Sequence, residues 1–254
     1  MTEADWRSSP EPQPMLRYLT GTTIERVGDL PSFPHQRGSD RKLRLFACAC
    51  YARLDDLLPD TPARAAVAVA ERFADGLADA GEMSAARRSV RGPLDALEPR
   101  WRASRGAERA DLFSLHEALA LAWQVLRPLA AAAAYYASSN AYLFFDVPRN
   151  ADFPKSDVAR GRTRRDEERA QADLLRCVFG NPFRPTLIDP ARLPAAAVSI
   201  ARGVYDNRAF GRLPEIAEAL KTSADPAGEA ADHCGRAGEH VRGCWVVDQV
   251  LGQT

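Results

Sequence analysis

The chain has 254 residues, of which 46% are hydrophobic and 27% are charged, values typical of a folded globular protein. Its 34 basic and 34 acidic side chains cancel, which removes the long-range attraction that draws a protein to nucleic acid or to an anionic membrane. Five cysteines are too few, and odd in number, for a disulfide framework, so the composition favours a reducing cytoplasm as the location.

Residues 1–37 form a polar, proline-rich amino-terminal segment, for which we expect only a short helix. Its beginning, Met1 to Pro14, contains no apolar signal core. The longest apolar run of the chain, Leu129 to Ala137, is about half of the roughly 20 residues that a membrane helix needs. The sequence therefore predicts a soluble protein with no membrane partner, and a single helical domain over residues 38–254.

Helical periodicity begins at Ser39 and continues to Leu58. Apolar residues recur there at steps of three and four, which predicts an amphipathic helix. These residues are Leu43, Phe46, Ala47, Cys50, Leu54, Leu57 and Leu58. Cys48 and Cys50 are two positions apart and so lie on nearly opposite sides, which favours core packing over a redox pair. Thr61-Pro62 then places a capping hydroxyl before a proline and starts the next helix.

The segment from Ala107 to Tyr142 is the most apolar part of the chain. Its leucines follow a helical stripe that Pro128 should interrupt, because proline lacks a backbone N–H. We therefore expect two helices here, which form the centre of a core for the amino-terminal and carboxy-terminal helices. His116 lies in the first of them, and a lone histidine there is typical of a hydrogen-bonded core residue rather than a general base.

Residues 146–161 lack periodicity and carry several prolines, which predicts a mobile loop. Thr163 to Asp166 then matches a capping box and predicts a helix to about Cys177. Four arginines at this boundary are candidates for phosphate contacts: Arg160, Arg162, Arg164 and Arg165. The acidic residues that follow at once neutralise them locally, so we interpret the cluster as a solvated helix start.

Beyond Phe179 the chain is divided by prolines into short segments. We expect an extended connection to Asp189, a short turn, a helix over Pro194 to Tyr205, and further helices that start at Leu213-Pro214 and Asp225-Pro226. Strand signals are nearly absent. The fold class is therefore all-α, a single compact domain of roughly eight to ten helices.

Four histidine and cysteine residues near the carboxy terminus have the donor types that zinc prefers. They are His233, Cys234, His240 and Cys244. Adjacent residues on a helix project about 100° apart, which argues against His233 and Cys234 as joint ligands. We expect His240 and Cys244, four positions apart, on one helical face. Helix capping by the histidines and core packing by the cysteines is the competing interpretation.

No catalytic motif is present in the sequence: it has no Gly-x-Ser-x-Gly turn, no phosphate-binding glycine loop and no helical Glu-x-x-His pair. Asp248 lies among valines near Trp245 and would need a partner such as Arg242, Arg212 or a backbone amide. A structural ion pair is the favoured interpretation over a catalytic acid. The sequence thus argues against an enzyme and provides no catalytic or cofactor-binding residue.

Several short motifs carry a resemblance to a known family. They are Met1-Thr-Glu-Ala-Asp-Trp6, Pro14-Met-Leu16, Asp40 to Cys50, Phe179-Gly-Asn-Pro-Phe-Arg-Pro185, Tyr205 to Phe210 and His240-Val-Arg-Gly-Cys-Trp245. Over most of its length the chain resembles a family of cytoplasmic proteins that occurs in many copies in planctomycete genomes. That family has no known activity, so the resemblance implies no catalytic residue. Relatives often carry a cysteine where this chain has Tyr51, which argues against a required metal centre at the amino-terminal cysteines.

Three functions follow as hypotheses. The leading one is a non-enzymatic interaction or regulatory module whose partner is another protein. The second is a zinc-stabilised or zinc-dependent protein that uses His233, Cys234, His240 and Cys244. The third, disfavoured by the net charge, is a nucleic-acid-associated factor in defence or regulation that uses the arginines of residues 160–165.

Overall fold

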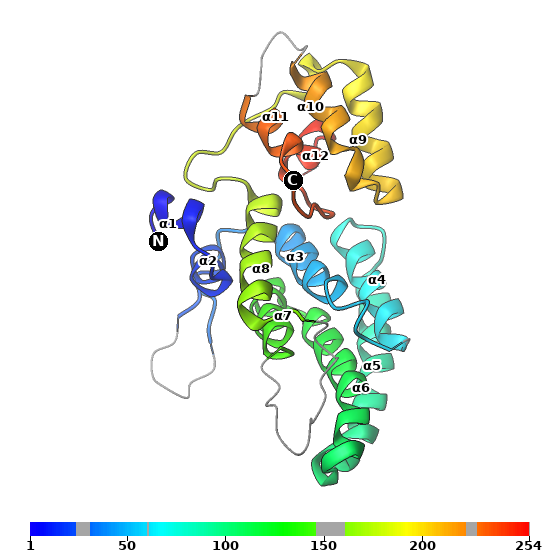
Figure 1. Ribbon diagram of the computed structural model, residues 1–254. Helices are drawn as coiled ribbons and strands as arrows, with labels where there is room; N and C mark the ends of the chain where they lie inside the picture. Colours follow the sequence, from blue (N-terminus) through cyan, green and yellow to red (C-terminus); the bar gives the residue numbers. More distant parts are fainter. Residues whose placement is uncertain (24–30, 60, 146–160, 222–227, 254) are drawn as a thin grey trace. The chain divides into compact units, whose positions relative to one another are not determined.

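The structure is a computed structural model that describes residues 1–23, 31–59, 61–145, 161–221 and 228–253 (Figure 1). Twelve α-helices lie within these ranges, together with one isolated bridge between Thr23 and Ser32 and no β-strand. The predicted all-α class is confirmed, with slightly more helices than the expected eight to ten. No helix in the described ranges is long and apolar enough to cross a membrane. The loop predicted over 146–161 lies outside the described residues except for Gly161.

The chain divides into two compact units. Unit 1 comprises Met1–Pro10 and Ala172–Thr254, and unit 2 comprises Glu11–Gln171. The boundary falls inside helix α8 (Arg164–Phe179), whose first half belongs to unit 2 and whose second half belongs to unit 1. The domain predicted over residues 38–254 therefore spans both units, and the predicted amino-terminal segment is divided between them, with α1 in one and α2 in the other.

Unit 2 is built mainly from helices that pack against their neighbours in the chain. Its elements are α2 (Pro12–Thr20), α3 (Asp40–Ala52), α4 (Pro62–Ala74), α5 (Ala80–Ala103), α6 (Gly106–Val125), α7 (Ala130–Leu143) and the first half of α8. The most extensive packing joins α3 to α7 and buries Leu43 and Phe46 on the apolar face of α3. Cys48 and Cys50 are buried in the same helix, as expected for core residues.

Local signals explain where these helices begin and end. The Ser39 side chain accepts a hydrogen bond from the Lys42 amide at 3.4 Å, and Thr61 caps α4 ahead of Pro62, as predicted. Pro128 separates α6 from α7, also as predicted. The side chain of Arg44 is nearly buried and donates to the carbonyls of Val125, Arg127 and Pro128, which are left without helical partners where α6 ends.

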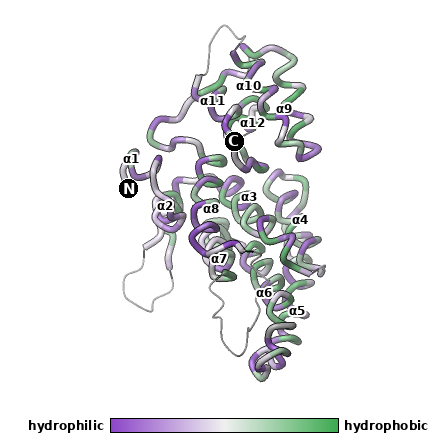
Figure 2. Tube along the Cα trace, viewed as in Figure 1, coloured by the Kyte–Doolittle hydropathy of each residue, from purple (hydrophilic) through white to green (hydrophobic). Residues whose placement is uncertain are grey.

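Unit 1 has a core of its own. Its elements are α1 (Glu3–Ser8), the second half of α8, α9 (Ala195–Asn207), α10 (Leu213–Lys221), α11 (Gly228–Gly235), α12 (Trp245–Val250) and 3-10 turns at Pro190–Arg192 and Phe210–Arg212. Figure 2 shows hydrophobic and hydrophilic residues alternating along α9 and α10, and the apolar ones meet around Val204, Ile216 and Trp245. The carboxy-terminal helices therefore form a core of their own within unit 1.

The short helices of unit 1 follow the proline signals. Asp189 caps the turn that begins at Pro190, and α9 and α10 begin at or next to the predicted positions. The start predicted at Asp225-Pro226 lies outside the described residues, and α11 is described from Gly228 onward.

The amino-terminal helix α1 is held against the carboxy-terminal part of the chain. Trp6 is buried, and its Nε1 donates to the carbonyl oxygen of Gly180 at 2.8 Å. The Nε of Arg176 donates to the carbonyl of Trp6 at 3.0 Å, and the Asn181 amide donates to Glu3 at 2.8 Å. These bonds bring Met1–Trp6 and Phe179–Pro185, two of the motifs that carried the family resemblance, together in unit 1.

Candidate metal centre

Four metal-binding side chains converge in unit 1. Cys177 comes from the last turns of α8, His233 from the end of α11, His240 from the turn that follows, and Cys244 from the residue that precedes α12. One ligand atom of each side chain lies within 4.8 Å of the other three. Both cysteines are buried and both histidines are half-buried, so the cluster is largely shielded from water.

The spacing of the four donor atoms suits a tetrahedral metal ion. Cys177 Sγ lies 3.5 Å from His240 Nδ1, and Cys244 Sγ lies 3.4 Å from His233 Nε2. The two imidazole rings are 4.9 Å apart and nearly perpendicular, at 85°. Zinc bonds of about 2.3 Å to sulfur and 2.0–2.1 Å to nitrogen place the donors of a tetrahedral site roughly 3.3–3.8 Å apart. The residues therefore fit a Cys2His2 zinc site.

The cluster contains three of the four ligands predicted from the sequence. The fourth member of the cluster is Cys177, which was not predicted. Cys234, which was predicted, is buried in α11 and does not belong to the cluster. The reason is the angle between neighbours on a helix: once His233 points to the centre, Cys234 is turned away by about 100°. No sequence spacing points to Cys177, because it lies far upstream of the other three residues. Only the tertiary structure brings it into the core that it shares with Cys244 and Trp245.

One local expectation was wrong. His240 and Cys244 were predicted on one helical face, but the residues between α11 and α12 are not helical. Gly243 has a φ of 87°, a left-handed conformation that glycine adopts without strain and that no α-helix continues through. The chain turns there, and the turn directs the His240 ring and the Cys244 sulfur toward the same point.

The surroundings of the cluster set different protonation preferences for its two cysteines. The hydrogen bond to Cys244, together with burial, raises the pKa of the Cys177 thiol well above its usual range. Burial also opposes ionisation of Cys244, but hydrogen bonds from Cys177, His233 and His240 outweigh it and hold the pKa of that thiol well below its usual range. Cys244 is therefore the cysteine that ionises first, and a thiolate is the form that binds a metal.

Second-layer contacts orient the histidines. The Nε2 of His240 lies 3.5 Å from the carbonyl oxygen of Arg236, which can only accept, so this nitrogen carries the proton and Nδ1 is left to bind. The His233 ring packs against Trp245 at 5.5 Å between centroids. Trp245 in turn lies against Gly180, where a Cβ atom would approach the indole to 3.1 Å. Each imidazole is thus held by a neighbouring part of the same unit.

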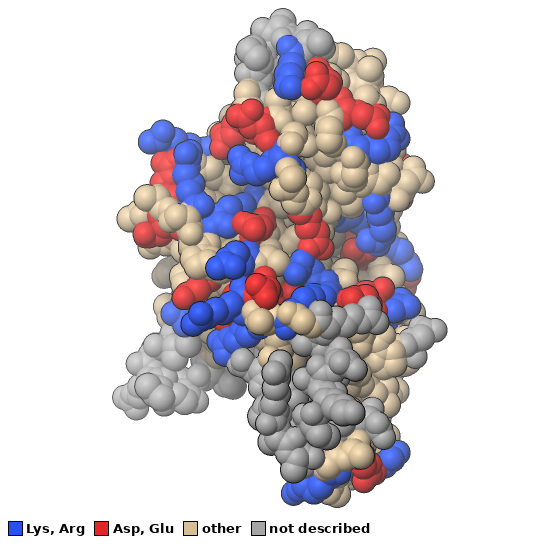
Figure 3. All heavy atoms as spheres, viewed as in Figure 1, with Lys and Arg blue, Asp and Glu red and all other residues tan. Residues whose placement is uncertain are grey.

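Two of the four arginines proposed for phosphate contact form ion pairs with carboxylates. In unit 2, Arg162 pairs with Glu167 at 3.1 Å and Asp56 at 3.5 Å, and Arg164 pairs with Glu168 at 2.8 Å. Arg165 is exposed, and Arg160 lies outside the described residues. On the face drawn in Figure 3, basic and acidic side chains lie intermixed, in keeping with the net charge of zero.

Two further residues, His116 and Asp248, have defined environments. The His116 imidazole hydrogen-bonds to Glu117 at 2.9 Å and Glu98 at 3.2 Å and stacks on Trp101, so the predicted hydrogen-bonded role is confirmed. Asp248 is fully buried in α12, while Arg212, one of its expected partners, forms two bonds of 2.8 Å with Glu215. The ion pair of Asp248 stays a prediction.

No protein-family model, no curated protein and no solved structure matches the chain. The fold and the site by themselves define an all-α protein with a Cys2His2 cluster that could hold a metal ion. Its function has to be argued from the chemistry of that cluster.

Proposed function

We propose that this protein binds one structural Zn²⁺ ion through Cys177, His233, His240 and Cys244. The convergence of these four donor atoms within 4.8 Å of one another carries the proposal. Thiolate and imidazole are the donors that structural zinc sites use, whereas Ca²⁺ and Mg²⁺ take oxygen ligands. Two thiolates also neutralise the charge of the ion, which lowers the cost of placing it in a buried site.

A structural role is favoured over a catalytic one by the number of ligands. A catalytic zinc ion keeps a coordination position open for water or substrate, whereas four protein ligands complete a tetrahedral shell. The ion would join α8, α11, the turn at His240 and the start of α12. Unit 1 contains several short helices, down to six residues in α1 and α12, and such elements depend on added crosslinks more than long helices do.

The interaction-module hypothesis stays a prediction. Among the described residues, the exposed large hydrophobic side chains are Met1, Leu77, Leu129 and Leu187. They are far apart in the sequence and do not indicate what kind of partner would bind. The arginines at 162 and 164, with their carboxylate partners, likewise do not favour a nucleic-acid ligand. The metal centre is therefore the feature with the most specific support.

Metal analysis of the purified protein tests the proposal. We expect about one equivalent of zinc per chain after dialysis against metal-free buffer, and a folded wild-type protein with less than about 0.2 equivalents would contradict it. Cys177→Ser and Cys244→Ser should each lose the ion. Cys234→Ser is the matched control, because this cysteine is buried in the same unit outside the cluster, and it should keep the ion.

Cobalt substitution gives a second readout that needs no variant. Co²⁺ in a tetrahedral site with two thiolates shows intense visible d–d bands and a sulfur-to-metal charge-transfer band, whereas a six-coordinate surface site shows only weak bands. The tetrahedral spectrum is expected for the wild-type protein and for Cys234→Ser. Weak bands alone would contradict the ligand set even if zinc is present.

A further inference from the structure

A pocket of about 250 Å³ opens beside His233, within unit 1. Three arginines and two tryptophans stand out among its lining residues: Arg7, Arg176, Arg236, Trp6 and Trp245. The pocket is smaller than the roughly 300–1,000 Å³ of sites for drug-sized ligands, so it suits a small molecule. Of the four proposed zinc ligands, His233 alone lines this pocket.

The charged groups of the wall favour an anion. The Arg236 guanidinium has no ion pair or side-chain hydrogen bond within the described part of the chain. Arg7 uses one nitrogen on Glu3 at 3.0 Å, which leaves its other N–H groups for a ligand. Arg176 is held in place by the carbonyls of Trp6 and Ser9.

The wall contains a single acidic side chain, Glu229, among the described residues. Its carboxylate already accepts a hydrogen bond from the Thr186 hydroxyl at 2.5 Å. The wall therefore carries three guanidinium groups against one carboxylate. Glu3 and Asp173, which pair with Arg7 and Arg176, do not line the pocket, so Arg236 supplies the uncompensated charge.

We propose that this pocket binds a small organic oxyanion, a carboxylate or phosphate monoester on a compact aromatic body, and that it does so only when zinc is bound. The planar guanidinium fork matches the oxygens of either group. Trp6 and Trp245 line the pocket but are only 1% and 5% exposed, so each adds a small apolar area to the wall beside the body of the ligand. This inference rests on the proposed zinc site.

The dependence on zinc follows from how the wall is built. Arg176 directly precedes the ligand Cys177, and Trp245 directly follows the ligand Cys244. His233 belongs to both sites, and the carbonyl of Arg236 accepts the hydrogen bond that orients His240. Without the ion these segments would no longer be held together, and the wall of the pocket would lose its arrangement. By linkage, an oxyanion that binds only the intact wall also strengthens zinc retention.

Calorimetric titration of the full chain tests the proposal with four probes: phenyl phosphate, benzoate, inorganic phosphate and phenol. Phenyl phosphate or benzoate should bind at least about tenfold more tightly than phenol, because hydrogen bonds to a charged acceptor are roughly twice as strong as those to a neutral one. The stronger of the two identifies the oxyanion. Either one should also exceed inorganic phosphate, which lacks the aromatic body.

Variants and the apo-protein complete the test. Arg236→Gln should weaken the bound probe about tenfold or more and leave the zinc content unchanged. Arg202→Gln is the control, because Arg202 is exposed on α9 and does not line the pocket, and it should bind as the wild type does. Protein stripped of zinc should not bind the probe.

The outcomes separate this inference from the zinc proposal. A protein without zinc would overturn both, and metal analysis of the same sample shows this directly. If the protein holds about one equivalent of zinc, any of three results would overturn the pocket proposal alone. These are no binding of any probe at about 10 mM, equal affinity for phenol and for the anions, or equal affinity of Arg236→Gln and the wild type for the probe. Equal binding by the zinc-free protein would overturn the dependence on the metal.

Discussion

The two units each contain a buried polar cluster, and the clusters satisfy their charges in different ways. In unit 2 the cluster surrounds Glu167, whose side chain is fully buried. In unit 1 it consists of Cys177, His233, His240 and Cys244. Both clusters join residues that are far apart in the sequence, so both depend on tertiary packing.

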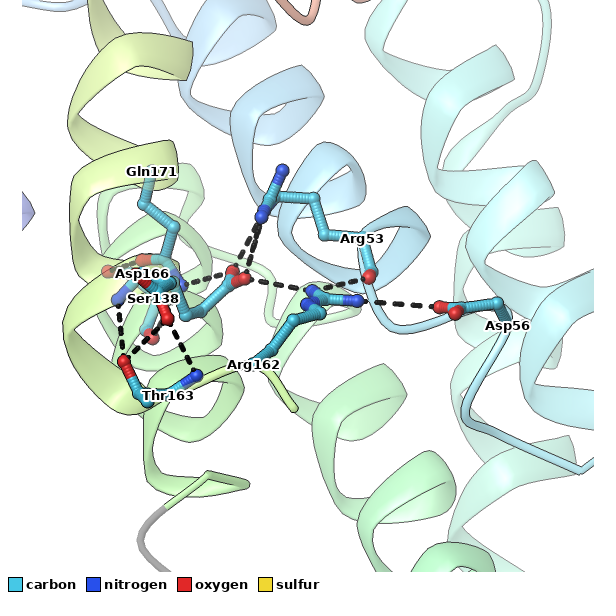
Figure 4. Close-up of polar contacts among 8 residues, drawn as sticks. Arg53, Asp56, Ser138, Arg162, Thr163, Asp166 and Gln171 are labelled. Atoms are coloured by element: carbon cyan, nitrogen blue, oxygen red, sulfur yellow. Dashed lines mark hydrogen bonds and ion pairs between the residues drawn. The ribbon is translucent and has the colours of Figure 1, made fainter. Parts of the chain in front are cut away.

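The cluster around Glu167 is linked by hydrogen bonds within unit 2, and Figure 4 labels its members Arg53, Ser138, Arg162 and Gln171. Glu167 accepts hydrogen bonds of 2.9–3.0 Å from Arg53, of 3.1 Å from Arg162 and of 3.0 Å from Gln171. Gln171 in turn accepts from the Ser138 hydroxyl at 2.6 Å. The negative charge of Glu167 faces two guanidinium groups, and each remaining polar group is paired with a donor or an acceptor. The buried polar groups of this cluster therefore have their partners in the protein.

The cysteine and histidine cluster differs because its four side chains bring lone pairs to one point. Such donors can share protons with one another, as the 3.4 Å and 3.5 Å contacts between sulfur and nitrogen indicate, but no cationic side chain is among them. A metal ion is the partner that this arrangement fits. The comparison therefore separates a network with its own countercharges from a cluster of donors that could hold a metal ion.

Metal removal should give the largest effect and should act on one unit only. Apparent binding energies of structural zinc sites are about 10–16 kcal/mol, so we expect chelation to destabilise unit 1 by several kcal/mol. Hydrogen exchange should show loss of protection in α11, α12 and the turn between them, and retained protection in α3 and α7. Equal loss in both units would remove the distinction between the two clusters.

Glu167→Gln should give the next largest effect, in unit 2. The variant leaves the buried side of Arg53 without its countercharge, which costs about 3–5 kcal/mol in comparable pairs. Urea unfolding measures this cost, and the zinc content should not change. Glu168→Gln is the control: its partner Arg164 is 41% exposed, so about 1 kcal/mol or less is expected. If Glu167→Gln has the same free energy of unfolding as the wild type, the network contributes little to stability.

Gly180→Ala should have a smaller effect and should reach the metal centre through Trp245. Gly180 has a φ of 62°, and a new Cβ would meet the indole at 3.1–3.3 Å, so a loss of about 1–3 kcal/mol is expected. Gly252→Ala separates the two causes, because Gly252 has a φ of 66° in the same unit with open space around it. If both variants lose the same stability, the contact with Trp245 contributes nothing. Thermal unfolding and zinc affinity are the measurements.

The smallest predicted effect is a pH dependence at His116 in unit 2. Burial lowers the pKa of His116, but hydrogen bonds to Glu117 and Glu98 outweigh it, so the pKa in the folded protein is raised. The protonated ring therefore stabilises the fold fully below the ordinary pKa of about 6.5, and this contribution disappears as the pH rises through the folded value.

His116→Phe tests this dependence, because phenylalanine keeps a ring against Trp101 and removes the charge. The stability difference between the wild type and the variant should shrink as the pH rises from about 6 to 9. Burial raises the pKa of Glu98, but hydrogen bonds from Arg102 and His116 outweigh it and lower that pKa, so the Glu98 carboxylate stays charged over this range. A difference that stays constant with pH would show that His116 contributes by packing alone.

Features that depend on neighbouring residues were predictable from the sequence. Ser39, Thr61 and Thr163 begin helices because a hydroxyl and the first backbone amides lie within a few residues of one another. Pro128 separates two helices for the same local reason. No helix was predicted over residues 80–103, yet α5 forms there and continues through Pro93 and Pro99.

The sequence alone determined the all-α class, most helix starts and the residue types of the cysteine and histidine cluster, since these follow from side-chain chemistry and short-range geometry. Only the tertiary structure decided that Cys177 takes the place expected for Cys234. It also decided that the carboxy-terminal helices form their own core and that Trp6 lies beside Gly180. The contacts of Cys177 with His240 and of Trp6 with Gly180 join segments more than fifty residues apart, and spacing along a helix carries no information at that distance.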